Sequence, residues 1–558
     1  MTKYEKKVLF ATTIGSMLEW YDFFLFGLIA NVMAKNFFSS FPSNIAFVFS
    51  LAIFAVGFVS RPFGAVIFGH LGDTIGRKYT FILTVMIMGI ATISIGLLPT
   101  SQQIGIYAPI MLVVIRIIQG LAMGGEVGGA VVYVAEHAPA HRRGEYTSWI
   151  LGVGSIGVFL ALIVIITTRT ILRDNSVDAA LRDARFEEWG WRVPFIFSSV
   201  ILAISIAIRL KLNESPMFLR MKEMGKLSAS PLRETMGRWK NAKYTVIGLF
   251  GLLIPMAISL ITGQFYALQF ITQTLRLDQM TANILLATVI LLGMPFYVIS
   301  GMISDRIGRK WLILGGTLVA IASFFPLFRA LTHYINPDLE YAINNAPITL
   351  TVDKNECHSQ FDPFKMKAIT TSCDIAVYSL AMANVPYHYS YTTPGSVAKI
   401  TIGANEIVSY RLVSEAEMPK TAKAINTANR ILFEEQLTTA LNAANYTNQA
   451  DPAKEHIAMV FLIMLALTIM GNFVSGSLPA CLVELFPTQI RYTGFSIPFH
   501  IGACLINGFF PAAAFAIVAM TGNIFDGLWI PVILGLCCVA VGAIFLPDSH
   551  RVRVSLDD

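Results

Sequence analysis

Apolar residues run through this chain in long continuous windows. A window of about 20 apolar residues can cross a hydrocarbon core about 30 Å thick as a helix. We identify twelve such windows, separated by polar segments, at about residues 10–34, 46–70, 79–98, 107–132, 147–168, 191–210, 244–271, 281–303, 311–333, 457–480, 493–520 and 527–546. The pattern predicts a polytopic helical membrane protein with all of its main elements α-helical.

Composition and charge add an orientation to this prediction. Of the 558 residues, 55% are hydrophobic and 14% are charged, whereas a soluble domain has roughly 25% charged residues. Lysine and arginine concentrate before the first window, in the segments after the second, fourth and sixth windows, and after the eighth. These segments share one side, which the basic residues mark as cytoplasmic. We therefore expect cytoplasmic termini, and we attribute the net charge of +6 to topology and not to nucleic-acid binding.

Two short motifs occur twice, at matching places in two sets of six windows. The segments GHLGDTIGRK (69–78) and GMISDRIGRK (301–310) share six of ten positions. The segments EHAPAHRR (136–143) and ELFPTQIR (484–491) share Glu-x-x-Pro-x-x-x-Arg. Two parallel six-helix repeats, with a substrate site between them, are the layout of the major facilitator transporters. The repeats therefore predict twelve transmembrane helices in two six-helix halves.

The second pair of motifs lies much farther apart than the first, so the second half should contain an insertion. The chain turns polar at 334–456, where alternating runs predict strands and 421–445 reads as an amphipathic helix. We predict a small extracytoplasmic α+β domain there; substrate capture, a partner surface and no role at all stay open. The predicted divisions are 1–212 for the N-terminal bundle, 213–243 for a cytoplasmic linker, 244–333 for helices seven to nine, 334–456 for the insertion, and 457–558 for helices ten to twelve with a short cytoplasmic tail.

Two of the six cysteines, Cys357 and Cys373, fall in this insertion. The charge bias places the insertion outside the cytoplasm, and the bacterial periplasm is oxidising. We therefore predict a disulfide between them, with two free thiols as the alternative. The other four cysteines lie in or beside apolar windows, where they read as small packing residues.

Several longer motifs resemble one family of transporters. They are LEWYDFFLFG (18–27), SRPFGAVIFGHLGDTIGRK (60–78), RIIQGLAMGGEVGGA (116–130), WGWRVPF (189–195), NESPMF (213–218) and ELFPTQIRYTGFS (484–496). Together they resemble the metabolite:proton symporters of the major facilitator superfamily, in family order. Two features depart from that pattern: Thr74 stands where the loop usually has arginine, and the large insertion is not typical.

This resemblance implies a function and a location. It implies uptake of a small organic acid, such as citrate, 2-oxoglutarate or shikimate, or of a zwitterion such as betaine, together with protons. It also implies a monomer in the bacterial inner membrane, whose partners are the substrate, protons and the lipid bilayer. A sensor that binds a nutrient on a transporter fold without moving it is the alternative.

Charged residues inside the apolar windows are expensive and default to functional hypotheses. Glu19 and Asp22, three residues apart, should share a face of the first helix, and Asp22 should lie near the midplane. Arg116 and Arg61 should lie at similar depths, so we predict them as the counter-charges. A carboxylate whose cation can move away can switch between protonated and ionised forms, as proton coupling requires. A fixed structural pair is the alternative, and Glu126 is either a proton relay or a packing residue.

Arg61 is also the candidate for substrate binding. A guanidinium can donate two parallel hydrogen bonds to a carboxylate; a gating or packing role is the alternative. Other polar residues in apolar windows should line the cavity, although about half should only join helices through hydrogen bonds. These candidates are Gln119, Gln264, Tyr266, Gln269, His500 and Asn507.

The repeated motifs supply candidate gating residues on the cytoplasmic side. We expect Asp73 and Asp305 to cap or pair across helix ends, beside the pairs Glu136–Arg143 and Glu484–Arg491. These contacts should hold the outward-open state together. The full set is Gly69, Asp73, Gly76, Arg77, Lys78, Glu136, Arg143, Asp305, Arg306, Gly308, Arg309, Lys310, Glu484 and Arg491.

Enzyme and pump signatures do not appear in the sequence. It contains no phosphate-cradling Gly-Lys-Ser/Thr motif, no nucleophile elbow and no clustered metal ligands. We therefore expect no catalytic residue, no metal and no cofactor, with transport driven by the proton gradient.

Overall fold

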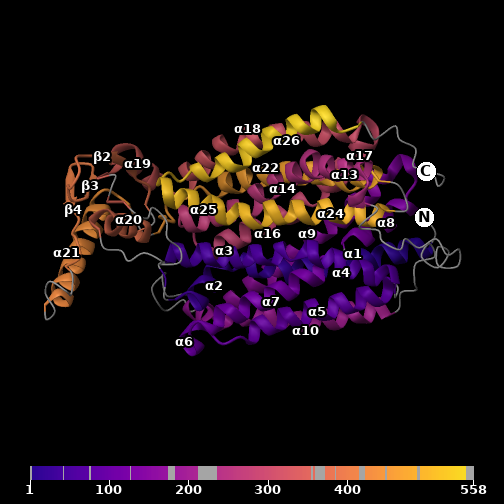
Figure 1. Ribbon diagram of the computed structural model, residues 1–558, viewed down its shortest axis with the longest axis horizontal. Helices are drawn as coiled ribbons and strands as arrows, with labels where there is room; N and C mark the ends of the chain where they lie inside the picture. The colour runs from indigo at the N-terminus through magenta and orange to yellow at the C-terminus, as the bar shows by residue number, and fades with distance from the viewer. Residues whose placement is uncertain are drawn as a thin grey trace.

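Helices form an elongated bundle, and a smaller mixed domain lies at one of its ends (Figure 1). This computed structural model describes residues 3–39, 41, 43–74, 77–125, 127–173, 183–210, 235–353, 356–357, 371–383, 385–413, 421–446, 449–486 and 490–547. We call the end with the mixed domain the insert end. The opposite end, where α9 (Arg143–Leu172) begins and α17 (Pro295–Ile307) ends, is the motif end, because the repeated motifs lie there.

Broken apolar helices make up the N-terminal half of the bundle. The first predicted window is a pair of helices bent by 58° at Ile29. The second window breaks at Ser60, just before Pro62, which lacks the N–H that a continuous helix would use. The helices are α1 (Lys3–Leu28), α2 (Ala30–Phe37), α3 (Ser43–Val59), α4 (Arg61–Thr74), α5 (Arg77–Leu97), α6 (Ser101–Ile104), α7 (Tyr107–Met123), α8 (Val127–His137), α9 and α10 (Arg192–Leu210), with short turns η1 (Ala140–Arg142) and η3 (Phe186–Gly190).

The C-terminal half repeats this arrangement with more irregular helices. Its helices are α13 (Trp239–Gly248), α14 (Ile254–Ile261), α15 (Ala267–Gln269), α16 (Gln279–Gly293), α17, α18 (Arg309–Ile335), α22 (Ile457–Gly476), α23 (Leu478–Glu484), α24 (Arg491–Ala503), α25 (Phe509–Thr521) and α26 (Trp529–Phe545). Wider π-helical turns interrupt them at η4 (Leu249–Leu253), η5 (Thr262–Tyr266), η6 (Phe270–Thr274) and η8 (Cys504–Gly508), and a short 3₁₀ turn, η9 (Asp526–Leu528), precedes α26. Such turns are frequent at functional sites.

The segment between α18 and α22 folds into the mixed domain. Its elements are α19 (Pro337–Asn345), β1 (Ile348–Val352), α20 (Ser372–Ala383), β2 (His388–Tyr391), β3 (Lys399–Ile402), β4 (Asn405–Val408) and α21 (Ala422–Ala443). The strands form one sheet in the order β2-β1-β3-β4, in which only β1 and β2 are parallel. Alternate residues of β1 are buried, as the period-two pattern predicts.

A disulfide joins Cys357 to Cys373 at the start of α20, with their Cα atoms 5.2 Å apart. The mixed domain is also tied to the bundle, because the Tyr387 N–H donates to the carbonyl of Gly522 in the turn after α25 (3.0 Å). Gly522 has φ +74°, a conformation that a side chain would strain. Helix α20 also contacts α3, so this domain touches both halves.

Nine helices in the described ranges are long and apolar enough to cross a membrane, and ten if the bent pair α1–α2 is one span. Two shorter apolar helices, Ile82–Leu97 and Arg192–Ala207, fall in the remaining two predicted windows. Large apolar side chains on the outside of the bundle, such as Phe63 and Ile90, are more than half exposed. Such a surface suits lipid and not water.

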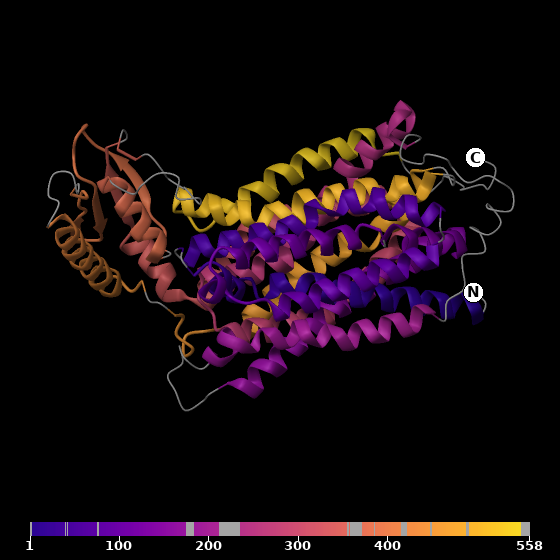
Figure 2. The same cartoon turned by 60° about the horizontal axis from the view of Figure 1, so that its bottom comes forward.

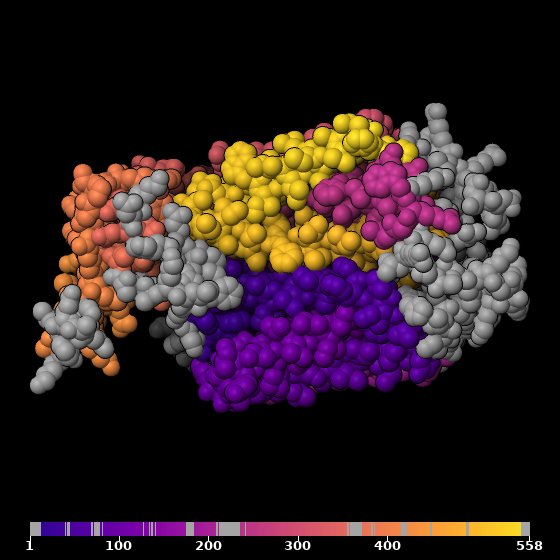
Figure 3. Space-filling view, viewed as in Figure 1, coloured from indigo at the N-terminus to yellow at the C-terminus, as the bar shows by residue number. Residues whose placement is uncertain are grey.

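The two halves lie side by side along the length of the bundle (Figures 2 and 3). Their helices approach most closely where side chains are small. At the motif end, a Cβ added to Gly144 of α9 would lie 2.6 Å from the carbonyl oxygen of Gly301 in α17. Any larger residue at either glycine would hold the two halves apart at this end.

Candidate functional site

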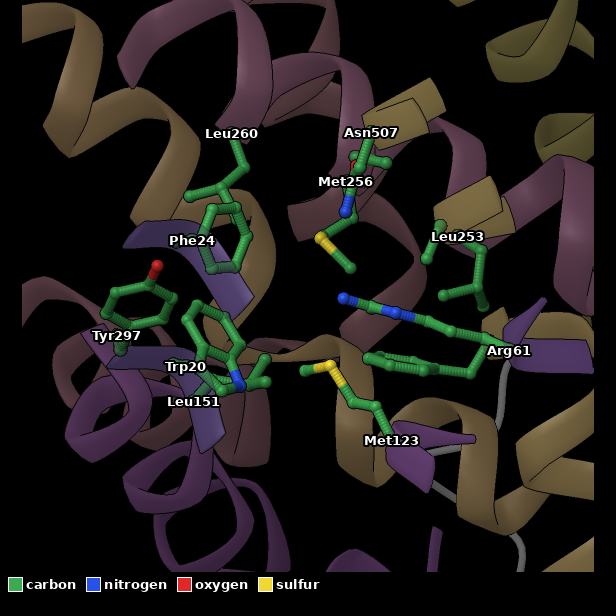
Figure 4. A pocket seen from close by; sticks show the side chains of 13 residues that line it. Trp20, Phe24, Arg61, Met123, Leu151, Leu253, Met256, Leu260, Tyr297 and Asn507 are labelled. Atoms are coloured by element: carbon green, nitrogen blue, oxygen red, sulfur yellow. The ribbon is translucent and has the colours of Figure 1, made fainter. Parts of the chain in front are cut away.

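A pocket lies between the two halves near the middle of the bundle (Figure 4). Side chains from α1, α4, α7 and α9 form one wall, and side chains from α14, α17, α24, η4 and η8 form the other. The space between atoms in and around the pocket, which includes open solvent, is about 590 Å³. Its lining residues are Trp20, Phe24, Arg61, Met123, Leu151, Leu253, Met256, Ala257, Leu260, Tyr297, Phe499, Ala503 and Asn507.

Arg61 is the one positively charged residue of this lining. Its side chain is 3% exposed, and its guanidinium points into the pocket between Met123 and Met256 (Figure 4). The guanidinium carbon lies 3.8 Å from the ring centre of Phe23 and 4.0 Å from that of Phe58. Its Nε and Nη2 atoms have no hydrogen-bond partner in the part of the chain that the structure describes. Ring faces attract a cation without neutralising it, so Arg61 presents an uncompensated charge to the pocket.

The predicted ion pair between Asp22 and Arg116 is wrong. Asp22 is buried, and its Oδ1 accepts a hydrogen bond from the Ser198 hydroxyl of α10 (2.6 Å). No ion pair joins it to a lysine or arginine among the residues described. The phase of α1 explains this, because neighbouring residues of a helix point about 100° apart. Asp22 therefore faces α10, while the adjacent Phe23 faces both arginines.

Arg116 is held by neutral groups. It donates to the Gln119 side-chain oxygen and to the Phe54 carbonyl, and its guanidinium carbon lies 4.6 Å from the ring centre of Phe23. Gln119 in turn donates to Thr92 Oγ1 (2.8 Å) and to the Asp22 carbonyl (3.2 Å). The link between Asp22 and Arg116 is thus indirect, through the Gln119 amide and the Asp22 backbone, and Gln119 does not line the pocket.

Two acidic candidates remain, and of these the structure describes Glu19 but not Glu126. Glu19 is 3% exposed, in the first helix as predicted. Glu126 lies outside the described residues. The glycines around it pack α7 tightly on α4, since a Cβ on Gly124 would lie 2.1 Å from the Arg61 carbonyl oxygen. Gly124 therefore lets α7 approach the backbone of Arg61 closely.

Of the polar candidates in the C-terminal half, Asn507 alone lines the pocket. Gln264 donates to Asn472 of α22 (2.9 Å), and Gln269 donates to the Gly27 carbonyl of α1 (3.0 Å). Tyr266 is fully buried among aromatic rings, and His500 is fully buried beside the pocket. None of these four residues is in the lining of this pocket. Gln264 and Gln269 join helices through hydrogen bonds, as was expected for about half of the candidates.

Four aromatic residues of the lining, Phe499 of α24 among them, were missed from the sequence. Trp20 and Phe24, one helical turn apart, place aromatic rings on the N-terminal wall, and Tyr297 faces them from α17 (Figure 4). The Tyr297 hydroxyl is buried, with no hydrogen-bond partner among the residues described. Trp20 and Phe24 both lie in the motif LEWYDFFLFG (18–27), and their spacing of one helical turn could have identified them as neighbours on one face. Nothing in the sequence distinguished Tyr297 from an ordinary core tyrosine.

Charged residues join the halves at the motif end. The two oxygens of Asp305, in α17, accept from the backbone N–H groups of Gly144 and Glu145 at the start of α9 (2.8 and 3.0 Å). A carboxylate at a helix N-terminus satisfies unpaired donors and the helix dipole together. Arg309 Nη2 also donates to Asp305 (2.9 Å). Asp305 therefore caps a helix of the opposite half, which is the type of contact predicted for it.

Glu484 completes this motif-end network. One of its carboxylate oxygens pairs with Arg143 of α9 (2.9 Å), and the other pairs with Arg309. The predicted partner was Arg491, but the described hydrogen bond of Arg491 goes to the Phe486 carbonyl (3.3 Å). Glu484 therefore pairs with arginines of two other motifs, one of them in the opposite half, and not with the arginine of its own motif. These residues meet because α9, α18 and α23 come together at the motif end.

The other gating candidates have separate positions. Gly308, with φ +97°, forms the sharp turn between α17 and α18, where only glycine is free of strain. Lys310 donates to the carbonyls of Ala543, in α26, and of Leu546, just after it (both 2.8 Å), and Arg306 is exposed. Gly69 lies within α4. Gly76 and the side chains of Asp73, Arg77, Lys78 and Glu136 lie outside what the structure describes.

Neutral contacts join the halves at the insert end. Phe54 of α3 stacks on Phe265 of η5, with ring centres 5.1 Å apart, and the Asn31 side chain donates to Gln279 (2.9 Å). The Gln269–Gly27 hydrogen bond lies on the same side. The halves are therefore in contact at both ends of the bundle, through charges at the motif end and through rings and amides at the insert end.

Comparisons with known proteins point to one group. The sequence profile of the "Sugar (and other) transporter" family matches residues 8–247. The inner membrane metabolite transport protein YhjE of Escherichia coli is 35% identical over 60% of this chain and 75% of its own length. The shikimate transporter of the same organism is 34% identical over 57% of this chain and 70% of its own. Both relatives are transporters and not enzymes.

A solved structure with a similar fold is the D-xylose-proton symporter. It has a TM-score of 0.56 and 17% sequence identity, over 99% of this chain and 100% of its own. At this identity the likeness concerns the fold alone. No group of three or more metal-ligating side chains occurs in the ranges that the structure describes.

Proposed function

Because the chain belongs to the major facilitator superfamily, among its metabolite:proton symporters, we propose that it takes up a small organic carboxylate or zwitterion together with protons. The substrate binds in the pocket between the halves, and the halves rock about it by alternating access. The observation that carries this proposal is Arg61, a buried cation aimed into the pocket, with which no carboxylate of the described residues pairs. A substrate carboxylate supplies the missing partner through a charge-assisted hydrogen bond.

Asp22 is the proposed proton carrier. A charged carboxylate in a low-dielectric interior is costly unless it is paired, and its hydrogen bond to Ser198 is neutral. Binding a proton removes that cost and losing it restores the charge, so the state of Asp22 can be coupled to the position of the halves. Glu19 is a second candidate on the same helix. Arg116 supports Asp22 indirectly through Gln119.

The topology belongs to the same proposal. Twelve spans cross the inner membrane, with the motif end and both termini in the cytoplasm and the 334–456 domain outside. The basic segments between the windows support this orientation. The Cys357–Cys373 bridge supports an oxidising location for the domain. The relatives are named as transporters, which gives no support to the sensor alternative.

Transport by reconstituted protein tests the proposal. Proteoliposomes with an imposed inward proton gradient receive labelled benzoate, 2-oxoglutarate, citrate, shikimate or betaine in turn. We expect at least one of them to accumulate above its external concentration, and a protonophore to abolish the accumulation. The exposed Glu435 of α21 provides a control variant, Glu435→Gln, that should transport normally. Equilibration that ignores the gradient, or transport of xylose with none of these compounds, would overturn the proposal.

A further inference from the structure

The side chains that line the pocket are mostly apolar, with few polar groups among them. One cation, Arg61, faces it, and the polar groups besides are the Trp20 indole, the Tyr297 hydroxyl and the Asn507 amide. The rest of the lining is apolar: Phe24, Met123, Leu151, Leu253, Met256, Ala257, Leu260, Phe499 and Ala503. A site of this composition can neutralise one negative charge and offers few hydrogen bonds.

The polar groups are also separated in space. Arg61 projects from one side of the pocket and Tyr297 stands on the opposite side, with the Trp20 and Phe24 rings between them (Figure 4). The Tyr297 hydroxyl is buried and without a hydrogen-bond partner in the described part of the chain, and so is Asn507 Oδ1. A buried polar group that stays unpaired is costly. The side opposite Arg61, where Tyr297 lies, is therefore suited to one additional polar group of a ligand, whereas Asn507 is drawn beside Met256, toward Arg61 (Figure 4).

A ligand with several charges or hydroxyls fits this lining poorly. Each of its polar groups loses water on entry, and methionine, leucine and phenylalanine side chains cannot replace that water. A second carboxylate would meet no cation in the pocket lining. An apolar ring, by contrast, gains from burial against Trp20 and Phe24, because aromatic surfaces bury large areas and pack in preferred geometries.

Resting on the proposed function, we propose that the substrate is a monocarboxylate with an apolar, ring-sized body and at most one polar group at its far end. Benzoate and 4-hydroxybenzoate represent this class. The carboxylate pairs with Arg61, the ring lies against Trp20 and Phe24, and a far hydroxyl bonds to Tyr297. Citrate, 2-oxoglutarate and shikimate, with additional charges or hydroxyls, bind weakly or not at all.

Titration calorimetry on the purified protein at pH 7 tests this assignment. The probes are benzoate, 4-hydroxybenzoate, citrate, 2-oxoglutarate and shikimate. We expect the two aromatic acids to bind at least about tenfold more tightly than the other three, since unpaired buried polar groups each cost this much or more. The variant Arg61→Lys should weaken both aromatic acids.

A second variant keeps the test independent of how well Arg61 variants fold. Tyr297→Phe removes one hydroxyl and keeps the ring, so it should fold normally. It should weaken 4-hydroxybenzoate about tenfold and leave benzoate unchanged. Equal effects on the two ligands, or no effect on either, would overturn the placement of the far hydroxyl.

The outcomes separate this inference from the function beneath it. Tighter binding of citrate, 2-oxoglutarate or shikimate, lost in Arg61→Lys, would overturn the substrate class and leave carboxylate transport standing. Aromatic acids that bind equally well to Arg61→Lys would overturn the assigned pose. If no carboxylate binds, the proposed function falls, and the inference falls with it.

Discussion

The two halves of the bundle contribute different chemistry to the interface between them. The N-terminal half buries Glu19, Asp22, Arg61 and Arg116, of which Arg61 lines the pocket. The C-terminal half faces the same space with apolar side chains and with the neutral polar groups of Tyr297 and Asn507. Two halves with repeated motifs and similar helix order thus differ in charge where they meet.

This difference suggests a division of roles. Charges in the membrane interior are costly and persist where they act on a charged ligand or a proton. Neutral and apolar side chains instead determine the shape that a ligand must have. We therefore propose that the N-terminal half binds the anion and couples the proton, and that the C-terminal half selects the substrate body.

The motif end is the exception, because the C-terminal half supplies decisive charges there. Glu484 is 2% exposed and pairs with Arg143 and Arg309 together. Removing one partner of a buried ion pair costs about 3–5 kcal/mol, since the other partner stays buried and unpaired. We predict that Glu484→Gln lowers stability by this amount and opens the motif end, measured as the thermal midpoint and as the distance between spin labels on α9 and α17.

Glu145→Gln is the matched control at the same end. Glu145 pairs with Arg142, whose side chain is 49% exposed, and exposed pairs contribute at most about 1 kcal/mol. An equal loss of stability in Glu484→Gln and Glu145→Gln would contradict the role given to Glu484.

The mixed domain extends the C-terminal half without lining the pocket. We predict that the double variant Cys357→Ser/Cys373→Ser destabilises this domain by about 3 kcal/mol, the value expected for a bridge closing a loop of about 15 residues. Hydrogen exchange in β1 and β3 should rise accordingly. Ligand affinity should stay unchanged; a weaker affinity would show that this domain takes part in binding.

Arg61→Lys tests the charged half at the pocket. A lysine keeps the charge but loses the planar pair of donors, so we predict a loss of about 1–3 kcal/mol in carboxylate binding. Calorimetry measures it. Arg192→Lys is the control, since Arg192 lies on α10 and donates to the Leu98 carbonyl away from the pocket. Unaltered affinity in Arg61→Lys for every carboxylate would exclude Arg61 as the anion site.

Asn507→Leu tests the neutral half and should have the smallest effect. The amide offers one neutral hydrogen bond, so we predict a change below about 1 kcal/mol in benzoate binding. A loss as large as that of Arg61→Lys would mean that the C-terminal half also binds the charged group, and the division of roles would fail.

Much of the fold could be predicted from the sequence, because its signals are long and repetitive. The resemblance to metabolite:proton symporters is confirmed by the relatives, and the helical membrane character by the long apolar helices. The breaks at Ile29 and Ser60 were not predicted. They depend on local backbone geometry, which an average over 20 residues does not record.

The site was harder to predict because it depends on the rotation of each helix. Gln264 lies in the π-helical turn η5, and Gln269 lies in α15 between η5 and η6, so the usual 3.6-residue period does not give their direction. Asp22 was identified as a buried carboxylate, but its neighbour Phe23, and not Asp22, faces the arginines. Pairing of buried charges is decided by contacts between distant segments, which one sequence alone does not contain.

The central claim is that Asp22 carries the proton while Arg61 holds the carboxylate. Counterflow and gradient-driven accumulation, measured side by side in proteoliposomes with Asp22→Asn, test it most directly. The amide resembles a permanently protonated Asp22, so we predict that exchange of labelled for unlabelled substrate persists while accumulation driven by the proton gradient disappears. Accumulation that stays at the wild-type level, with the same pH dependence, would contradict the claim.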